Sequence, residues 1–136
     1  MATVLILDSE ALSSVARARS GSKVDRKAQA VIEAAQKAGA DIRVPAAVLA
    51  EVIHGTAGDA AVNLVMQKLV VVPLSAAIAR IAGALLHGCA MDSRHAVDAF
   101  VVATAIRLGG GIIATHDVDD ITRLAAKHPN IKVFPI

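Results

Sequence analysis

The sequence predicts a single α/β domain, residues 1–136, built on a mainly parallel five-stranded sheet with helices on both faces. Three observations support this prediction. The Val, Leu and Ile run in residues 3–7 lacks polar alternation, which is typical of a strand buried on both faces. Similar short runs alternate with segments whose apolar residues recur at helical spacing. Of the 136 residues, 55% are hydrophobic, which is enough to fill one core.

Five short segments are predicted strands because each is apolar and is bounded by turn or helix signals. They comprise residues 3–7, 41–44, 69–74, 112–115 and 131–134. Every strand but the last precedes a predicted helix, which is the order of strand–helix units in a parallel sheet. Ligands of such sheets bind near the carboxyl ends of the strands. Side chains that follow these strands are therefore candidates for a functional site.

Helices are predicted between the strands from the spacing of apolar residues. They cover residues 9–19, 24–37, 45–55, 60–68, 75–87 and 95–108, and a further helix follows residue 119 or 120. Pro45 is well placed to begin its helix and Gly55 to end it, while Ser75 is suited to cap another. Asp119 or Asp120 can cap the last helix.

The helix predicted over residues 95–108 carries a carboxylate among apolar residues. At about 100° per residue, one arc is almost entirely apolar, and Ala99 and Ala103 fall opposite to it. The arc consists of Val97, Val101, Val102, Thr104, Ala105 and Leu108. Asp98 falls inside this arc, where an ionised carboxylate is costly unless a cation or hydrogen-bond donors are near. No Lys or Arg occurs between residues 95 and 106, so the compensating group must come from elsewhere.

Cys89 is the only cysteine, which excludes an internal disulfide and a zinc cluster of several thiolates. A reducing compartment fits this count. Charges interrupt each apolar segment before the roughly 18 residues that a membrane span requires. No basic region precedes the first apolar run, as a signal peptide would require. We therefore expect a cytoplasmic protein with no membrane contact.

The composition limits how the protein can handle nucleic acid. A formal net charge of +2 permits a polyanionic substrate without requiring one. Phe100 and Phe134 are the only aromatic residues, so platforms for stacking bases are not expected. A nucleic acid would be contacted through its backbone and through a metal ion.

Asp8, Glu51, Asp98 and Asp117 differ from the other acidic residues because each abuts or interrupts an apolar segment. Asp8 and Asp117 come at the ends of predicted strands, whereas Glu51 lies beside the apolar stripe of a helix. Strand–helix units can bring these three to one edge of the sheet, with Asp98 projecting inward from its helix. Taken singly, each also has a structural explanation, as a helix cap, an exposed flank or the partner of a distant arginine. Agreement among the four favours a functional cluster.

Carboxylates confined together repel one another, which raises their pKa values unless a cation neutralises them. Oxygen ligands without a paired histidine motif suit Mg²⁺, with Mn²⁺ as a substitute. Such an ion can lower the pKa of a bound water, orient it and stabilise charge on a phosphate, so the residues predict phosphodiester hydrolysis. The five histidines lack a metal-binding spacing and are interpreted singly as packing or surface residues. His116 is the exception to test, because it adjoins Asp117.

Four segments, in a fixed order, carry a resemblance to a known family. They are LILDSEAL near the start, VPAAVLAEVIHG in the middle, HAVDAFVVATAIRLGGGIIATHDVDDI further on, and IKVFPI at the end. Together they resemble the PIN-domain family, and within it the VapC-type toxins of bacterial toxin–antitoxin pairs. The resemblance spans the whole chain and keeps the order of the acidic residues.

This resemblance implies a three-layer α/β/α fold and an endoribonuclease that cleaves RNA and is silenced by a cognate antitoxin. It implies a tendency to form a homodimer. It also implies a catalytic, metal-binding quartet, with the first and third members as direct Mg²⁺ ligands. The quartet falls on Asp8, Glu51, Asp98 and Asp117.

Two residues depart from those frequent in the family. Glu10 stands where a small polar residue is common, and it is a candidate extra ligand. His116 stands directly before Asp117, at a position where Ser or Thr is frequent in the family. Asp119 and Asp120 are close alternatives for the fourth acidic position.

Two other interpretations remain open. A PIN-like protein that has lost activity would be a non-catalytic binding or regulatory protein, although the intact quartet argues against this. A phosphoacceptor signalling domain is also a small parallel α/β protein. It should carry a second acidic residue beside Asp8 and a lysine after a late strand, where Ser9 and Pro135 stand instead.

Basic residues cluster around the break between the first two predicted helices. They are Arg17, Arg19, Lys23, Arg26 and Lys27. A solvated corner is the simpler interpretation, because Lys and Arg are common on surfaces. The functional alternative is a contact for an RNA backbone or for the antitoxin, which the basic and amphipathic character of residues 17–27 favours.

Overall fold

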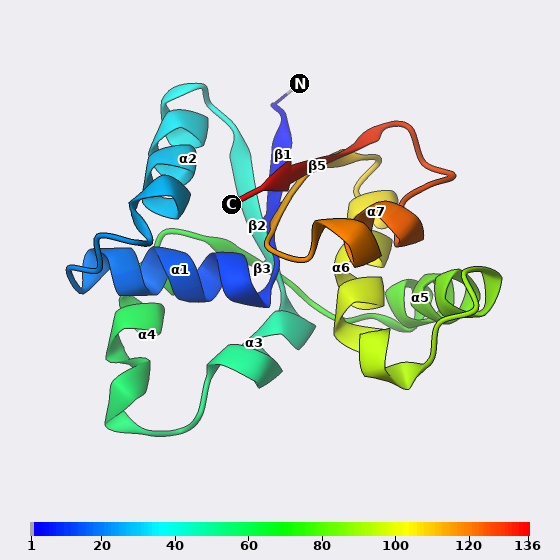
Figure 1. Ribbon diagram of the computed structural model, residues 1–136, viewed down its shortest axis with the longest axis horizontal. Helices are drawn as coiled ribbons and strands as arrows, with labels where there is room; N and C mark the ends of the chain where they lie inside the picture. Colours follow the sequence, from blue (N-terminus) through cyan, green and yellow to red (C-terminus); the bar gives the residue numbers. More distant parts are fainter. Residues whose placement is uncertain (1) are drawn as a thin grey trace.

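A parallel sheet of five strands in the order β3-β2-β1-β4-β5 runs through the protein in a computed structural model that describes residues 2–136 (Figure 1). The strands are β1 (Val4–Leu7), β2 (Asp41–Pro45), β3 (Val70–Val72), β4 (Gly111–Thr115) and β5 (Ile131–Pro135). Every neighbouring pair within residues 2–136 is parallel. The predicted α/β class and strand number are therefore confirmed.

Helices cover both faces of this sheet, as predicted. They are α1 (Ser9–Arg19), α2 (Arg26–Lys37), α3 (Ala46–Val52), α4 (Ala60–Met66), α5 (Ala76–Gly88), α6 (Ala96–Arg107) and α7 (Val118–Leu124), with 3-10 turns η1 (Ala57–Asp59) and η2 (Ser93–His95). In Figure 1, α1, α2 and α4 lie on one side of the sheet and α5, α6 and α7 on the other. Apolar side chains of both helical layers join those of the sheet in one buried cluster.

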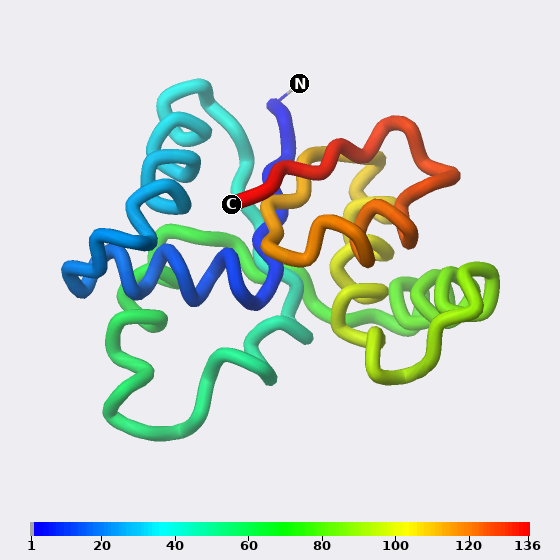
Figure 2. Tube along the Cα trace, viewed as in Figure 1, coloured from blue at the N-terminus to red at the C-terminus, as the bar shows by residue number. Residues whose placement is uncertain are grey.

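β1 occupies the middle of the sheet and is buried on both faces. Leu5, Ile6 and Leu7 are at most 3% exposed. The register pairs Leu7 with Ala114, and the Asp8 amide continues the ladder by donating to the Ala114 carbonyl at 3.3 Å. Figure 2 shows the segments that leave β1 and β4 side by side, although about a hundred residues separate them in sequence. The side chains after these two strands consequently share one edge of the sheet.

α6 is buried around most of its circumference. Ala99 and Ala103, predicted to face away from the core, are 0% exposed, so that prediction was wrong. The helix lies between the sheet and the helices α5 and α7, which it contacts on its other sides. Small alanine side chains allow this close approach. Asp98 is half-buried in the first turn.

α7 begins earlier than predicted. Its first residue is Val118, so Asp119 and Asp120 lie within its first turn and neither caps it. The Ile121 amide donates to the Asp117 carbonyl at 3.1 Å, which makes Asp117 the residue at the helix start. As a result, three acidic residues crowd the end of α7 nearest the sheet edge.

The boundaries of two other helices test the predicted end signals. Pro45 ends β2 and precedes α3 instead of being its first residue, and α3 stops before Gly55. Ser75 caps α5 as predicted, because its hydroxyl accepts a hydrogen bond from the Ile78 amide at 3.2 Å.

No helix within residues 2–136 has both the length and the apolar character needed to cross a membrane.

Candidate functional site

A pocket of about 370 Å³ opens at the carboxyl edge of the sheet. It is lined by Asp8, Ser9, Glu10, Glu51, Arg94, His95, Asp98, His116, Asp117 and Asp120. These residues come from the ends of β1 and β4 and from α1, α3, η2, α6 and α7. All four predicted carboxylates line this pocket, so the fold brings together residues from four distant segments.

Asp8 is the most buried carboxylate of the pocket, with 4% of its surface exposed. It stands at the N-cap of α1, where its Oδ1 accepts a hydrogen bond from the Ala11 amide at 2.8 Å. Burial raises the pKa of Asp8 above its ordinary value, although hydrogen bonds from Thr115 and Ala11 oppose this shift. The helix-cap interpretation is therefore correct for Asp8, and the same side chain faces the pocket.

Asp98 lies among other negative charges. Burial and then the charges of Asp117, Asp8 and Asp120 raise its pKa to about 7. Arg94 also lines the pocket, but its guanidinium is paired with Asp92 at 3.0 Å and its side chain is 84% exposed. Asp98 thus has no neutralising arginine within residues 2–136.

Glu51 reaches the pocket from the last turns of α3 and is exposed. The Ser9 hydroxyl donates a hydrogen bond to Glu51 Oε1 at 2.5 Å. Because Ser9 is the first residue of α1, this bond holds the Glu51 carboxylate against the start of that helix. The pairing of Ser9 with Glu51 could not be read from their separation of 42 residues.

Asp117 is exposed and sits on a turn held by the end of β4. Its amide donates to the hydroxyl of Thr115 at 2.8 Å, and Thr115 is fully buried. The intervening His116 is exposed, with its Nε2 3.5 Å from the Ser14 hydroxyl. Thr115 was not among the predicted site residues, yet its hydroxyl contacts both the Asp8 carboxylate and the Asp117 amide. A Thr-x-Asp spacing at a strand end was the available signal.

His95 and Asp120 complete a compact group with Asp98. One potential ligand atom from each lies within 4.8 Å of the other two. The interpretation of His95 as a packing or surface residue missed this arrangement, although His95 and Asp98 are one helical turn apart. Of the two alternatives for the fourth acidic position, Asp120 lines the pocket, whereas Asp119 is exposed outside it.

Glu10 is already paired. Its Oε1 accepts a hydrogen bond from Arg17 at 2.7 Å, and Arg17 also binds Asp25 at 3.0 Å. The Asp25 carboxylate raises the pKa of Arg17, and Arg17 lowers the pKa of Asp25 to about 2. Arg17 therefore belongs to an intramolecular network and is not a free member of the predicted basic cluster.

The acidic pocket and the sheet order define an α/β protein with a carboxylate-lined site at the carboxyl edge of its strands. The sequence matches the PIN domain family over residues 5–127. The chain therefore belongs to the PIN domain family, as its motifs suggested. It has no significant match among curated proteins.

Solved structures with the same fold include three from toxin–antitoxin systems. VapBC2 from Rickettsia felis, bound to a DNA fragment from its promoter, has a TM-score of 0.70 at 13% identity, covering 98% of both chains. A toxin–antitoxin complex from Klebsiella pneumoniae has a TM-score of 0.67 at 19% identity, covering 97% of this chain and 99% of that one. VapBC-1 from nontypeable Haemophilus influenzae has a TM-score of 0.66 at 17% identity, covering 97% of both. These similarities establish the three-layer fold.

Proposed function

We propose that this single-domain protein is a metal-dependent endoribonuclease and the toxin of a toxin–antitoxin pair. In this proposal Asp8, Glu51, Asp98 and Asp117 form a catalytic site that holds Mg²⁺, or Mn²⁺ in its place, directly or through a bound water, and RNA is cleaved at this site. The observation that carries it is the convergence of these four side chains, from four separate segments, on one pocket. Family membership supports the nuclease class.

The donor set fits a hard divalent cation. The carboxylates offer oxygen atoms, and burial together with the neighbouring negative charges raises the pKa of Asp98. When bound, the ion supplies acidity to water and positive charge to a phosphate. An open pocket of about 370 Å³ leaves room for a phosphate beside the carboxylates.

The four carboxylates are held differently, which suggests different roles. Asp8 is buried and hydrogen-bonded to a helix start, so it is rigid and suited to direct ligation with Asp98. Glu51 and Asp117 are exposed at the rim of the pocket. We assign them to accept hydrogen bonds from water and to orient it toward the phosphate. The Ser9 hydroxyl fixes the direction of the Glu51 carboxylate.

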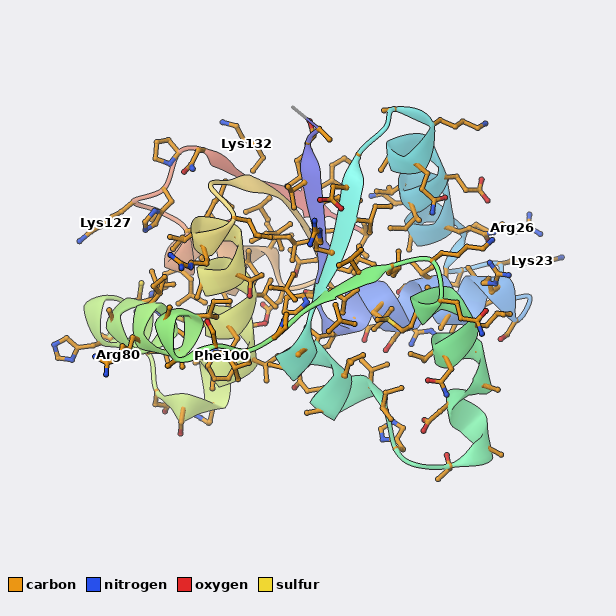
Figure 3. The ribbon with its side chains drawn as sticks, turned by 180° about the vertical axis from the view of Figure 1, so that it is seen from behind. Lys23, Arg26, Arg80, Phe100, Lys127 and Lys132 are labelled. Atoms are coloured by element: carbon orange, nitrogen blue, oxygen red, sulfur yellow. The ribbon has the colours of Figure 1, made fainter. Side chains whose placement is uncertain are left out.

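An antitoxin and an RNA are the proposed partners. The comparable structures from Rickettsia felis and Klebsiella pneumoniae are complexes of toxin–antitoxin systems, which supports an antitoxin partner. Lys23 and Arg26 project away from the body of the protein at the turn between α1 and α2 (Figure 3). We propose this turn as the antitoxin contact, and we propose a homodimer in solution.

Cleavage assays test the enzymatic part of this proposal. Purified protein should cut RNA with Mg²⁺ or Mn²⁺ and should lose this activity in EDTA. Asp98→Asn should abolish cleavage, while Glu33→Gln, the same type of change on the exposed face of α2, should leave it intact. Equal cleavage by the wild type and Asp98→Asn, or none by either across varied RNAs, would instead support the non-catalytic interpretation.

Binding and light-scattering measurements test the proposed antitoxin contact and the proposed homodimer. Charge reversal at Lys23 and Arg26 should weaken binding of the cognate antitoxin, whereas Lys132→Glu, on β5 well away from this turn, should not (Figure 3). Unchanged affinity in the double variant would remove this turn from the interface. Light scattering of the isolated protein reports its oligomeric state, and a monomeric mass would contradict the homodimer.

A further inference from the structure

A histidine and two carboxylates converge from three elements at one end of the acidic pocket. His95 is the last residue of η2, Asp98 lies in the first turn of α6, and Asp120 lies in the first turn of α7. His95 Nδ1 is 3.4 Å from Asp120 Oδ2. One ligand atom of each residue lies within 4.8 Å of the others, a spacing that a single metal ion can bridge.

The backbone that presents these three side chains is well ordered by hydrogen bonds. Asp92 caps η2 by accepting a hydrogen bond from the Arg94 amide at 3.0 Å, and the His95 amide donates to the Asp92 carbonyl at 3.1 Å. The fully buried Ile121 anchors the first turn of α7. The ligand atoms therefore need little rearrangement to bind an ion.

The side chains are also accessible. His95 and Asp120 are each about a third exposed, at 30% and 31% of their side-chain surface, and all three residues line the open pocket. An ion can enter from solvent, and water can complete its coordination. A wholly buried His–Asp pair would have no such access.

We propose that His95, Asp98 and Asp120 form a site for a first-row transition-metal ion, which shares Asp98 with the proposed Mg²⁺ site. This inference rests on the proposed metal-dependent function and adds a preference that oxygen ligands alone do not give. Imidazole nitrogen is a good ligand for Zn²⁺, Ni²⁺ and related ions, whereas Mg²⁺ takes oxygen ligands almost exclusively. His95 therefore biases this end of the pocket toward ions such as Co²⁺ and Zn²⁺.

The competing explanation is a simple ion pair between protonated His95 and Asp120. An ion pair requires a positive charge on the imidazole but no metal. The metal site requires a neutral imidazole whose Nδ1 lone pair faces the ion. Direct binding measurements separate the two without any assay of RNA cleavage.

Calorimetric titrations of the metal-free protein with Co²⁺ and with Mg²⁺ give the ratio of the two dissociation constants. We expect His95→Ala to reduce the preference for Co²⁺ over Mg²⁺ by about tenfold or more. His95→Asp, which restores a ligand but with oxygen, should also lose the preference. His87→Ala, at an exposed histidine of α5, should retain the wild-type ratio.

NMR of the imidazole nitrogen nuclei, recorded with and without Zn²⁺, provides a second measurement. Zn²⁺ should shift the Nδ1 resonance of His95 and leave that of His87 in place. An unchanged ratio of affinities in both His95 variants, or a His95 resonance that does not respond to Zn²⁺, would overturn the inference. Absence of RNA cleavage would instead count against the proposed function, because neither binding measurement depends on it.

Discussion

His95 Nδ1 and Asp120 Oδ2 lie 3.4 Å apart and join the N-terminal ends of α6 and α7 at the carboxyl edge of the sheet. Backbone amides at helix N-termini carry partial positive charge, which favours acidic side chains there. Asp98 and Asp120 both lie in such first turns. The fold thus gathers carboxylates where helix starts partly offset their repulsion, and a cation would offset the remainder.

The metal-free protein should lose stability as the pH rises from about 4 to about 7. Asp98 titrates near pH 3.8 when unfolded and at about 7 when folded, so over this range the unfolded chain gives up its proton first. We expect a loss of about 1–2 kcal/mol, reduced by solvent screening at a half-exposed group. Urea unfolding in EDTA at pH 5 and pH 8 measures it. Asp98→Asn should show a smaller difference between the two pH values; an equal difference would assign the effect to other groups.

Divalent ions should reverse this loss at pH 8. Ligand binding to the folded state adds about 1.4 kcal/mol when the ion is at about ten times its dissociation constant. Thermal unfolding with and without Mg²⁺ should therefore show a higher Tm for the wild type and no change for Asp98→Asn. Glu33→Gln is the control and should show the same rise in Tm as the wild type. The same rise in Tm for wild type and Asp98→Asn would mean that the ion binds elsewhere.

Substitutions of Asp8 should separate its role as a helix cap from its charge. Asn caps a helix about as well as Asp, so Asp8→Asn should retain the hydrogen bond from the Ala11 amide. Asp8→Ala should lose it and cost about 1 kcal/mol more than Asp8→Asn. Both variants should lose metal binding. Chemical denaturation in EDTA compares their stabilities, and identical values would show that the cap contributes nothing.

Gly111→Ala should destabilise the centre of the sheet. A Cβ at Gly111 would lie 2.7 Å from the carbonyl oxygen of Val4 on the adjacent strand, and the residue has φ +148°. We expect a cost of about 2 kcal/mol or more, because backbone must move to relieve the contact. Gly83→Ala is the matched control, since nothing lies within 4 Å of its Cβ and alanine favours helix. Unfolding midpoints should move in opposite directions for the two variants.

The sequence was sufficient for the fold because its strands are continuous apolar runs. Residues 3–7 predicted a fully buried strand, and Leu5 to Leu7 are buried. The same local reasoning failed for α6, whose alanines looked outward-facing by helical periodicity. Periodicity describes the faces of one helix, whereas the burial of Ala99 depends on α5 and α7 packing around it.

The sequence alone determined the α/β class, the strand order along the chain and the identity of the acidic residues at strand ends, because these depend on local pattern. The tertiary structure decided which charges meet. It paired Ser9 with Glu51 and placed His95 beside Asp120, neither of which spacing could predict. Such contacts form between side chains of segments distant in sequence. Their geometry follows from how helices pack on the sheet, which no single segment encodes.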